Sequence, residues 1–279
     1  MSEKVYLNGS FLPKHEAKIS PDDRGFNFAD GVYEVIKYYK GKPFRLEDHL
    51  DRLERSLKEV RIHYPGTRDL PGVLMELLKM NELNGSEAGV YIQITRGAHR
   101  RVHHFPETEQ PTVYISAFPF GSFTEWLENG IGVITREDIR WMRCDIKSVS
   151  LLPNTMLYDE ARQNGAGECV MVRDGNVTEA THSTVFGVKG GRLYTHPQSN
   201  LILPGITRKV ILEMCILHDI PFEEKPIPES MLTDMDELFI AGTGSEVTPV
   251  VMVNGKKIGD GKPGIVTRKI QGLFFGFFD

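Results

Sequence analysis

Hydrophobic and polar positions in the first half of the chain follow two periods. Short alternating runs flank Asn8-Gly9, a pair typical of the tight turn of a β-hairpin. Leucines spaced three or four positions apart from Leu46 to Leu57 instead predict an amphipathic helix. In chain order, these patterns predict a hairpin over residues 5–12, a hairpin from 31–36 to 44–45, helices over 47–60 and from 70 to about 84, and strands over 90–94 and 112–115.

The second half contains more glycine and proline between its apolar runs. Turn signals at 174–176 and 189–191 join neighbouring strands closely, and strands joined in this way are antiparallel. Strands and helices do not alternate regularly, which argues against a Rossmann fold or a TIM barrel. The patterns predict strands over 132–135, 169–173, 185–188, 237–241 and 247–253, and helices over 150–164, 207–218 and 264–277.

The two halves are separated by a stretch rich in turn-forming residues, 118–122. We therefore expect an N-terminal α/β domain over residues 1–118, a linker over 119–122 and a C-terminal domain over 123–279. A chain of 279 residues is long enough for two modest domains.

Composition narrows the class of protein. Charged residues make up 25% and hydrophobic residues 40%, which is typical of a globular chain and not of a disordered one. The net charge of -5 argues against nucleic acid as a partner, and no apolar run is long enough to span a membrane. The N-terminus lacks the apolar stretch of a secretory signal. Three cysteines without CxxC spacing indicate reduced thiols, a cytoplasmic protein and no structural zinc.

Two segments of the second half could bind a phosphate. Residues 203–208 lead into a helix through Pro204 and Gly205, and the free N–H groups of a helix start attract anions. Thr207 could cap that helix, and an ordinary capped helix is the alternative interpretation. Residues 240–245 contain two glycines and two hydroxyl side chains after a strand, which fits either an anion cradle or a plain turn. Neither segment has the Walker A or GxGxxG pattern.

Two side chains could carry chemistry. Lys147 lies among mainly uncharged, bulky neighbours and could attack a carbonyl as a free amine, although a surface lysine is the alternative. Glu179 follows a short strand among small polar residues. It could be an exposed turn residue, or a buried carboxylate that holds a proton on a heterocycle.

A cationic loop lies between two predicted strands. His99, Arg100, Arg101, His103 and His104 precede Phe105, without interleaved acidic or cysteine ligands. The adjacent arginines would repel a divalent cation, so we expect no metal here. The forked guanidinium matches a carboxylate, and a solvated loop is the alternative.

Taken together and in order, these features resemble one family. The segments that carry the resemblance are 23–34 (DRGFNFADGVYE), 49–53 (HLDRL), 145–148 (DIKS), 177–179 (VTE), 203–208 (LPGITR) and 245–249 (SEVTP). In this order they resemble the fold-type IV pyridoxal-phosphate aminotransferases, from about residue 4 to residue 270. Residues 140–148 and the segments 95–97 and 103–107 are most similar to D-amino acid aminotransferases.

The resemblance implies a two-domain α/β (α+β) fold with a smaller N-terminal domain and a larger C-terminal domain, the latter built on a mostly antiparallel, barrel-like sheet. It implies pyridoxal 5'-phosphate as the cofactor. Lys147 would hold the cofactor as an internal aldimine and move a proton, and Glu179 would pair with its pyridine nitrogen. Leu203 would pack on the ring, and the phosphate would be held by Arg52, Ile206, Thr207 and Thr243.

The substrates implied are a D-amino acid and a 2-oxo acid, pyruvate or 2-oxoglutarate, used in a ping-pong reaction. Tyr33, Arg101 and His103 would bind the substrate carboxylate. Because this loop resembles one that reaches in from a neighbouring subunit, a homodimer is implied.

The sequence departs from the family pattern at two places. Residues 180–183 read Ala-Thr-His-Ser where relatives usually carry a serine cluster, which places His182 beside the expected cofactor. Gly242 stands where a hydroxyl residue is common, so one phosphate hydrogen bond is expected to be missing.

Other functions stay open at this level. A branched-chain L-amino acid aminotransferase, or one with mixed D-amino acid and (R)-amine activity, shares the phosphate motifs. Aminodeoxychorismate lyase shares the lysine, and a phosphosugar-binding protein without a cofactor would need only the anion sites. The carboxylate loop favours transamination of D-amino acids.

Overall fold

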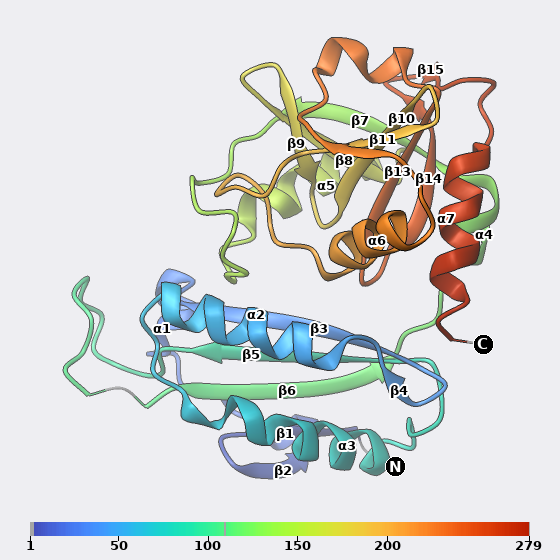
Figure 1. The fold of residues 1–279 in the computed structure, drawn as a ribbon. Coiled ribbons are helices and arrows are strands. Elements are labelled where there is room, and N and C mark those ends of the chain that lie inside the picture. Colours follow the sequence, from blue (N-terminus) through green and yellow to red (C-terminus); the bar gives the residue numbers. More distant parts are fainter. Residues whose placement is uncertain (1–2, 109, 279) are drawn as a thin grey trace. The chain divides into compact units, whose positions relative to one another are not determined.

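A computed structural model describes residues 3–108 and 110–278 of the chain. These residues form two compact units. Unit 1 contains the described residues up to Gly121 together with Ile146–Leu151, and unit 2 contains Ser122–Asp145 and the described residues from Leu152 onward. Figure 1 shows the strands and helices of both units in sequence colours.

Unit 1 is built on one antiparallel sheet of six strands in the order β2-β1-β6-β5-β3-β4. Its strands are β1 (Lys4–Leu7), β2 (Ser10–Pro13), β3 (Gly31–Tyr39), β4 (Lys42–Pro43), β5 (Ala88–Thr95) and β6 (Thr112–Pro119). Its helices are α1 (Arg24–Phe28), α2 (Leu46–Glu59) and α3 (Leu70–Met80), with 3-10 turns at Lys14–Glu16 and Pro65–Asp69. The hairpin predicted over 5–12 and the helix predicted over 47–60 are confirmed. The second hairpin also forms, but its returning strand is Lys42–Pro43 and not 44–45, because Arg45 already leads into α2.

One face of this sheet is covered by helices. Alternate residues of β3, β5 and β6, such as Val32, Ile92 and Ile115, pack in one buried cluster with leucines of α2 and α3. The opposite face therefore carries the other residues of the same strands, because side chains alternate along a strand. α3 ends at Met80, earlier than the sequence indicates, because the backbone turns left-handed at Glu82, with a φ of 59°. The Asn81 side chain donates a hydrogen bond to Leu77 O at 2.9 Å at this end.

Unit 2 is built on a nine-stranded sheet with the path β12-β11-β10-β13-β14-β7-β8-β9, in which β15 also pairs with β14. Its strands are β7 (Ile131–Glu137), β8 (Glu168–Arg173), β9 (Asn176–Ala180), β10 (Thr184–Lys189), β11 (Arg192–Thr195), β12 (Phe222–Glu224), β13 (Glu237–Gly242), β14 (Glu246–Val253) and β15 (Lys256–Lys257). Its helices are α4 (Thr124–Asn129), α5 (Leu152–Gln163), α6 (Ile206–Leu217) and α7 (Ile265–Phe275), with a 3-10 turn at Glu229–Asp234.

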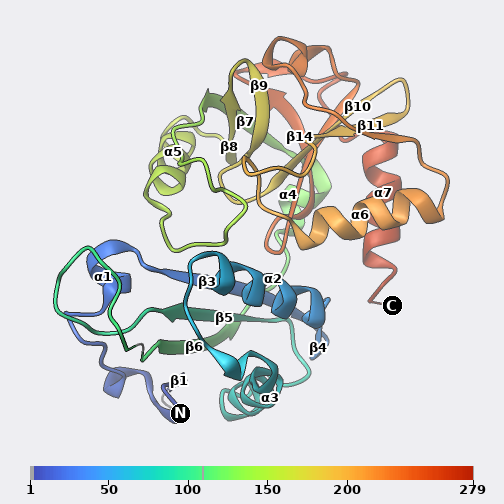
Figure 2. The ribbon, with the colours of Figure 1, turned by 60° about the vertical axis from the view of Figure 1, so that its left-hand side comes forward.

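The sheet of unit 2 is mixed and curled. Both predicted tight turns join antiparallel pairs, β8 with β9 and β10 with β11. The pairs β14 with β7, β7 with β8, and β11 with β12 are parallel, and α5 makes the crossover between β7 and β8. Apolar residues of β9 and β10 share one buried cluster with β13 and β14, so the sheet curls around its own core. Figure 2 shows this curl from a second direction.

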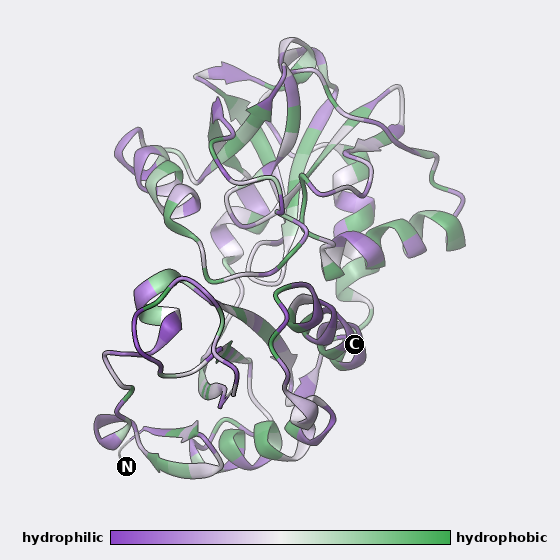
Figure 3. Ribbon diagram, turned by 90° about the vertical axis from the view of Figure 1, so that its left-hand side faces the viewer, coloured by the Kyte–Doolittle hydropathy of each residue, from purple (hydrophilic) through white to green (hydrophobic). Residues whose placement is uncertain are grey.

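The hydropathy of the chain matches this arrangement. In Figure 3 the central strands of unit 2 are largely hydrophobic, and the helices carry both hydrophobic and hydrophilic residues. Among the described residues, no helix is both long enough and apolar enough to cross a membrane.

Candidate functional site

Lys147 lies on Ile146–Leu151, a segment of unit 1 that in the sequence falls between two stretches of unit 2. The segment runs beside the start of β3: Tyr33 N donates to Lys147 O at 3.0 Å, and Val149 N donates to Gly31 O at 3.1 Å. Lys147 N also donates to Ser56 Oγ on α2 at 3.3 Å. These bonds fix the backbone on both sides of the lysine. The helix predicted over 150–164 starts only at Leu152, because the residues before it belong to this segment.

The amine of Lys147 lies over an aromatic ring. Its Nζ is 4.2 Å from the ring centroid of Tyr33, and the half-buried Tyr33 lies beside Tyr91 at 5.8 Å between ring centroids. Among the described residues, no hydrogen bond or ion pair engages this amine. The arrangement holds a primary amine against a flat surface, with its nitrogen available to a ligand.

Glu34, the residue after Tyr33 on β3, points to the opposite face of the sheet and binds Arg52 there. Glu34 is fully buried and accepts hydrogen bonds from Arg52 Nε at 2.7 Å and Arg52 Nη2 at 2.9 Å. His49 Nδ1 lies 2.8 Å from the second carboxylate oxygen. Burial raises the pKa of Glu34, but Arg52 and His49 lower it more, so this carboxyl stays ionised. The guanidinium of Arg52 is therefore held in one orientation by a buried counter-charge.

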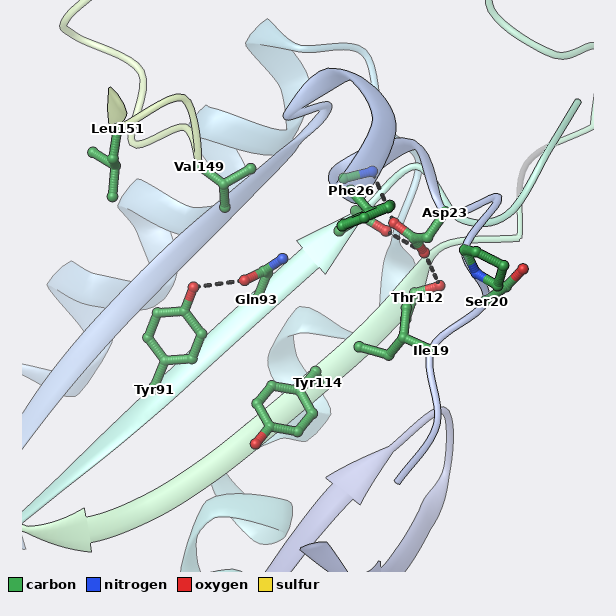
Figure 4. A pocket seen from close by; sticks show the side chains of 13 residues that line it. Ile19, Ser20, Asp23, Phe26, Tyr91, Gln93, Thr112, Tyr114, Val149 and Leu151 are labelled. Carbon is green, nitrogen blue, oxygen red and sulfur yellow. Dashed lines mark hydrogen bonds between the residues drawn. The ribbon is translucent and has the colours of Figure 1, made fainter. Parts of the chain in front are cut away.

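A pocket of about 650 Å³ opens on the helix-free face of the same sheet. Figure 4 shows Tyr91, Gln93 and Tyr114 pointing into it from β5 and β6, with Val149 and Leu151 of the Lys147 segment on its other side. Tyr91 Oη donates to Gln93 Oε1 at 2.6 Å, and burial raises the pKa of Tyr91 to about 12. The pocket is thus mainly apolar with a few oriented polar groups, as small-molecule sites usually are.

The cationic loop places two of its side chains on one ring. The Arg101 guanidinium lies 5.1 Å from the Phe28 ring centroid, and the His103 ring lies 5.5 Å from it. Both side chains are exposed. In the part of the chain that the structure describes, no hydrogen bond, ion pair or ring contact joins Tyr33 to Arg101 or His103. Among the described residues, no direct contact therefore links Tyr33 to the other two residues expected to bind a carboxylate.

Glu179 is a buried carboxyl on β9. It forms an ion pair with Arg140, and its second oxygen accepts a hydrogen bond from Leu203 N at 3.2 Å. Burial raises the pKa of Glu179, and this effect exceeds the lowering by Arg140. Asp138 holds the other side of Arg140, at 2.8 Å from Nη2 and 2.9 Å from Nε. A carboxyl in this state is suited to hold or share a proton with a buried nitrogen.

The start of α6 lacks a side-chain cap. Its N-cap residue is Gly205, which has no side chain to bond the free N–H groups of the first turn. The expectation that Thr207 caps the helix is wrong: Thr207 is the second residue inside it, so its hydroxyl does not act as the cap. No acidic residue stands in this first turn. Ile206 and Thr207 therefore present backbone donors at the positive end of the helix dipole.

Hydroxyl groups surround two glycines next to this helix start. A Cβ atom on Gly205 would lie 2.9 Å from Thr184 Oγ1, and one on Gly242 would lie 2.9 Å from Ser245 Oγ. Ser183 Oγ and Ser245 Oγ are hydrogen-bonded at 2.8 Å. Thr243 follows Gly242 directly in the chain. The hydroxyl groups of Ser183 and Ser245 thus lie beside Gly242, which has no side chain of its own.

Residues 31–253 match the family described as amino-transferase class IV. The chain belongs to the class IV aminotransferases. It is 44% identical over 270 residues to D-alanine aminotransferase of Staphylococcus haemolyticus, covering 96% of this chain and 95% of that one. It is 40% identical over 269 residues to D-alanine aminotransferase of Bacillus licheniformis, covering 96% and 94% of the two chains.

Solved structures of this family confirm the expected fold class. The branched-chain amino acid aminotransferase of Escherichia coli is similar with a TM-score of 0.93 and 28% identity, covering all of this chain and 95% of that one. The enzyme of Thermoproteus uzoniensis, solved with norvaline, has a TM-score of 0.90 and 28% identity, covering 98% and 94% of the two chains.

The sequence patterns gave no role to several residues that the structure places in these clusters. Arg140 stands in the quoted motif, but only the structure pairs it with Glu179. His182 stands beside the hydroxyl groups in the chain, yet its ring lies 2.8 Å from buried Glu168 and edge-on to Tyr158. The pocket could have been predicted from Tyr91 and Gln93, two polar residues at alternate positions of an otherwise apolar strand.

Proposed function

We propose that this chain transfers the amino group of D-amino acids to a 2-oxo acid, pyruvate or 2-oxoglutarate, with pyridoxal 5'-phosphate as its cofactor. The observation that carries the proposal is the amine of Lys147 held over Tyr33 in a chain 44% identical to a D-alanine aminotransferase. Identity to the solved branched-chain enzymes is only 28%, which favours D-amino acids over branched-chain L-amino acids.

The residues present fit this cofactor group by group. A phosphate needs N–H donors and hydroxyls without nearby acidic groups, which the start of α6 and the two glycines provide. A protonated pyridine nitrogen needs a buried carboxylate, and Glu179 is one. When bound, the cofactor supplies an electron sink that stabilises negative charge at the substrate Cα.

Each residue then has a defined task. With the cofactor bound, the Lys147 amine would accept the proton that leaves the substrate Cα, while the backbone hydrogen bonds on both sides of the lysine hold the residue in place. Glu179 keeps the pyridine nitrogen protonated, and Arg140 orients that carboxylate. Leu203 would pack on the pyridine ring. The phosphate would be bound by the backbone of Ile206 and Thr207, and by Thr243 and Arg52.

Arg52 serves the phosphate through its buried partner. Glu34 neutralises its charge and fixes its plane, so binding an anion requires no reorganisation of the guanidinium. Ser183 and Ser245 offer hydroxyls beside Gly242, which compensates for the hydroxyl that relatives carry there.

We also propose a homodimer in which the substrate carboxylate is bound by Tyr33 of one chain and by Arg101 and His103 of the other. The absence of contacts between Tyr33 and these two residues among the described residues of one chain supports this assignment. The side chain of the substrate would use the pocket lined by Tyr91, Gln93 and Leu151.

We place the enzyme in the cytoplasm. Cys144, Cys169 and Cys215 are buried and free, and burial raises their thiol pKa values to about 11, 12 and 11. Such thiols persist in a reducing compartment.

A substrate panel tests the proposal. The purified holoenzyme is assayed with D- and L-alanine, D- and L-glutamate and L-leucine, each with pyruvate or 2-oxoglutarate. We expect turnover of the D-forms. Preference for L-leucine would indicate a branched-chain enzyme, and additional activity on an (R)-amine would indicate a mixed specificity. No turnover of these amino acids, together with release of pyruvate from aminodeoxychorismate without a 2-oxo acid, would indicate a lyase. Borohydride reduction followed by peptide mapping should label Lys147, and label on another lysine would contradict its role.

A further inference from the structure

The arginine–histidine loop, residues 98–108, has few backbone hydrogen bonds of its own. His99 N donates to Asp22 O at 3.1 Å, and Val102 N donates to Arg100 O at 2.8 Å. Arg100, Arg101 and His103 are exposed. A loop with so little internal bonding keeps one conformation only if other groups hold it.

Phe105 anchors the loop among three guanidinium groups. Its ring centroid lies 3.6 Å from Cζ of Arg96, 4.9 Å from that of Arg61 and 5.8 Å from that of Arg24. Arg96 is completely buried, whereas Phe105 is 39% exposed. The ring thus covers a buried cation, and a desolvated cation–π contact is the strong form of this interaction.

Asp30 fixes two of these arginines. It accepts hydrogen bonds from Arg24 Nε at 2.8 Å and from Arg96 Nε at 2.8 Å and Nη2 at 3.0 Å. Arg96 also donates to Val60 O at 2.7 Å, at the end of α2. The arginines that contact Phe105 are therefore held by hydrogen bonds to Asp30 and to the end of α2.

Arg24 also contacts the part of the loop that carries Arg101. Arg24 Nη1 donates to Val102 O at 2.7 Å, one residue beyond Arg101. Arg24 also lies 4.6 Å from the centroid of Phe28, the ring that Arg101 and His103 contact. Asp30, through Arg24, is thus connected to both exposed residues.

We propose that Asp30, Arg24, Arg96 and Phe105 form a latch that positions Arg101 and His103 for the substrate carboxylate. None of the four touches the reacting atoms, so they are positioning residues, and the inference rests on the proposed function. When the latch is broken, the loop samples other conformations. The apparent affinity for a carboxylate then falls by the fraction of time that the loop spends in the binding conformation.

The test compares the holoenzyme with Phe105→Ala and Asp30→Asn. The control is Phe11→Ala, which removes a half-buried ring of β2 that packs on Tyr6, away from the loop. We measure KM and kcat for D-alanine, inhibition by propionate, and the rate at which trypsin cleaves after Arg100 and Arg101. Propionate has the carboxylate of alanine without its amino group.

We expect both latch variants to raise KM and the propionate inhibition constant by about tenfold, with kcat within about threefold of wild type. Trypsin should cleave the loop about tenfold faster in these variants, and Phe11→Ala should change neither KM nor the cleavage rate. Phe105→Leu keeps an apolar side chain without the aromatic face and should lie between wild type and Phe105→Ala. It also serves as the test variant if Phe105→Ala does not fold.

Arg101→Ala tests the carboxylate role of the loop separately from the latch. If Arg101→Ala leaves KM unchanged, the carboxylate role of the loop is wrong, and the trypsin rates still decide whether the latch exists. If Arg101→Ala raises KM but Phe105→Ala and Asp30→Asn change neither KM nor cleavage, the latch is overturned. A fall in kcat with unchanged KM and unchanged cleavage would also contradict it.

Discussion

Burial decides the behaviour of Glu179 at the scale of a single residue. Its pKa lies above the ordinary value of 4.5 because burial disfavours the charge more than Arg140 favours it. The folded protein therefore binds this proton more tightly than the unfolded chain. The contribution of Glu179 to the free energy of unfolding is complete in acid and declines as the pH rises above about 4.5.

Glu179→Gln should remove this decline while damaging catalysis. In urea unfolding of cofactor-depleted protein, the variant should lose less stability between pH 5 and pH 8 than wild type does, because the neutral amide has no charge to bury. Its kcat should fall by at least about tenfold, because the carboxylate of Glu179 stabilises the protonated pyridine nitrogen most strongly in the transition state. Arg140 keeps Asp138 as a partner, which limits structural damage. Turnover within about twofold of wild type would reject the proposed role.

At the scale of elements, a buried ion pair between Glu34 on β3 and Arg52 on α2 connects the sheet to the helix. Glu34 is fully buried and Arg52 is 7% exposed. Arg52 and His49 lower the pKa of Glu34 despite its burial. The stabilisation is therefore present at neutral pH and is lost as the pH falls through the folded-state pKa.

Glu34→Gln should lower the free energy of unfolding by about 3–5 kcal/mol at pH 7, because it leaves Arg52 buried without its counter-charge. The difference from wild type should shrink in acid, where Glu34 itself becomes protonated. The matched control is Glu54→Gln, which removes an exposed partner of Arg68. That change should stay within about 0.5 kcal/mol. Equal effects of the two substitutions in chemical denaturation would contradict the importance of the buried pair.

The start of α6 provides a second test at this scale. Gly205 has a φ of -65°, so alanine suits its backbone, but the new Cβ would lie 2.9 Å from Thr184 Oγ1. We expect Gly205→Ala to weaken binding of pyridoxal phosphate about tenfold in equilibrium dialysis, because the cradle for the phosphate becomes smaller. Gly272→Ala on α7, where a Cβ meets nothing within 4 Å, is the control and should leave binding unchanged. Unchanged affinity in Gly205→Ala would place the phosphate elsewhere.

At the scale of the whole molecule, the proposed dimer predicts complementation. Arg101→Ala and Lys147→Ala should each be nearly inactive at low D-alanine concentration. After the two variants are unfolded and refolded together in equal amounts, half of the dimers are hybrids, and each hybrid has one site with both native residues. About a quarter of wild-type activity should return. No recovery, with hybrid dimers demonstrated by differential tagging, would mean that both residues act within one chain.

Local patterns in the sequence were enough to predict most elements and the order of the motifs. The hairpin at Asn8-Gly9 and the helix over 47–60 follow from turn chemistry and from residue spacing, which depend only on near neighbours. The resemblance to the aminotransferase family rested on motifs in the same way. The short helix α1 and the strand β12 carry too few residues for such a pattern and were not predicted.

The tertiary structure decided which side chains are buried and with which partners. No local signal showed that residues 146–151 leave unit 2 and pair with the start of β3, because that pairing joins positions more than a hundred residues apart. The same holds for the contact of Arg140 with Glu179 and of Arg96 with Phe105. Thr207 looked like a cap because its type favours that position, yet the backbone turned helical at Ile206. Spacing along a chain encodes local geometry, whereas charge burial and ion pairing depend on contacts that only the folded chain creates.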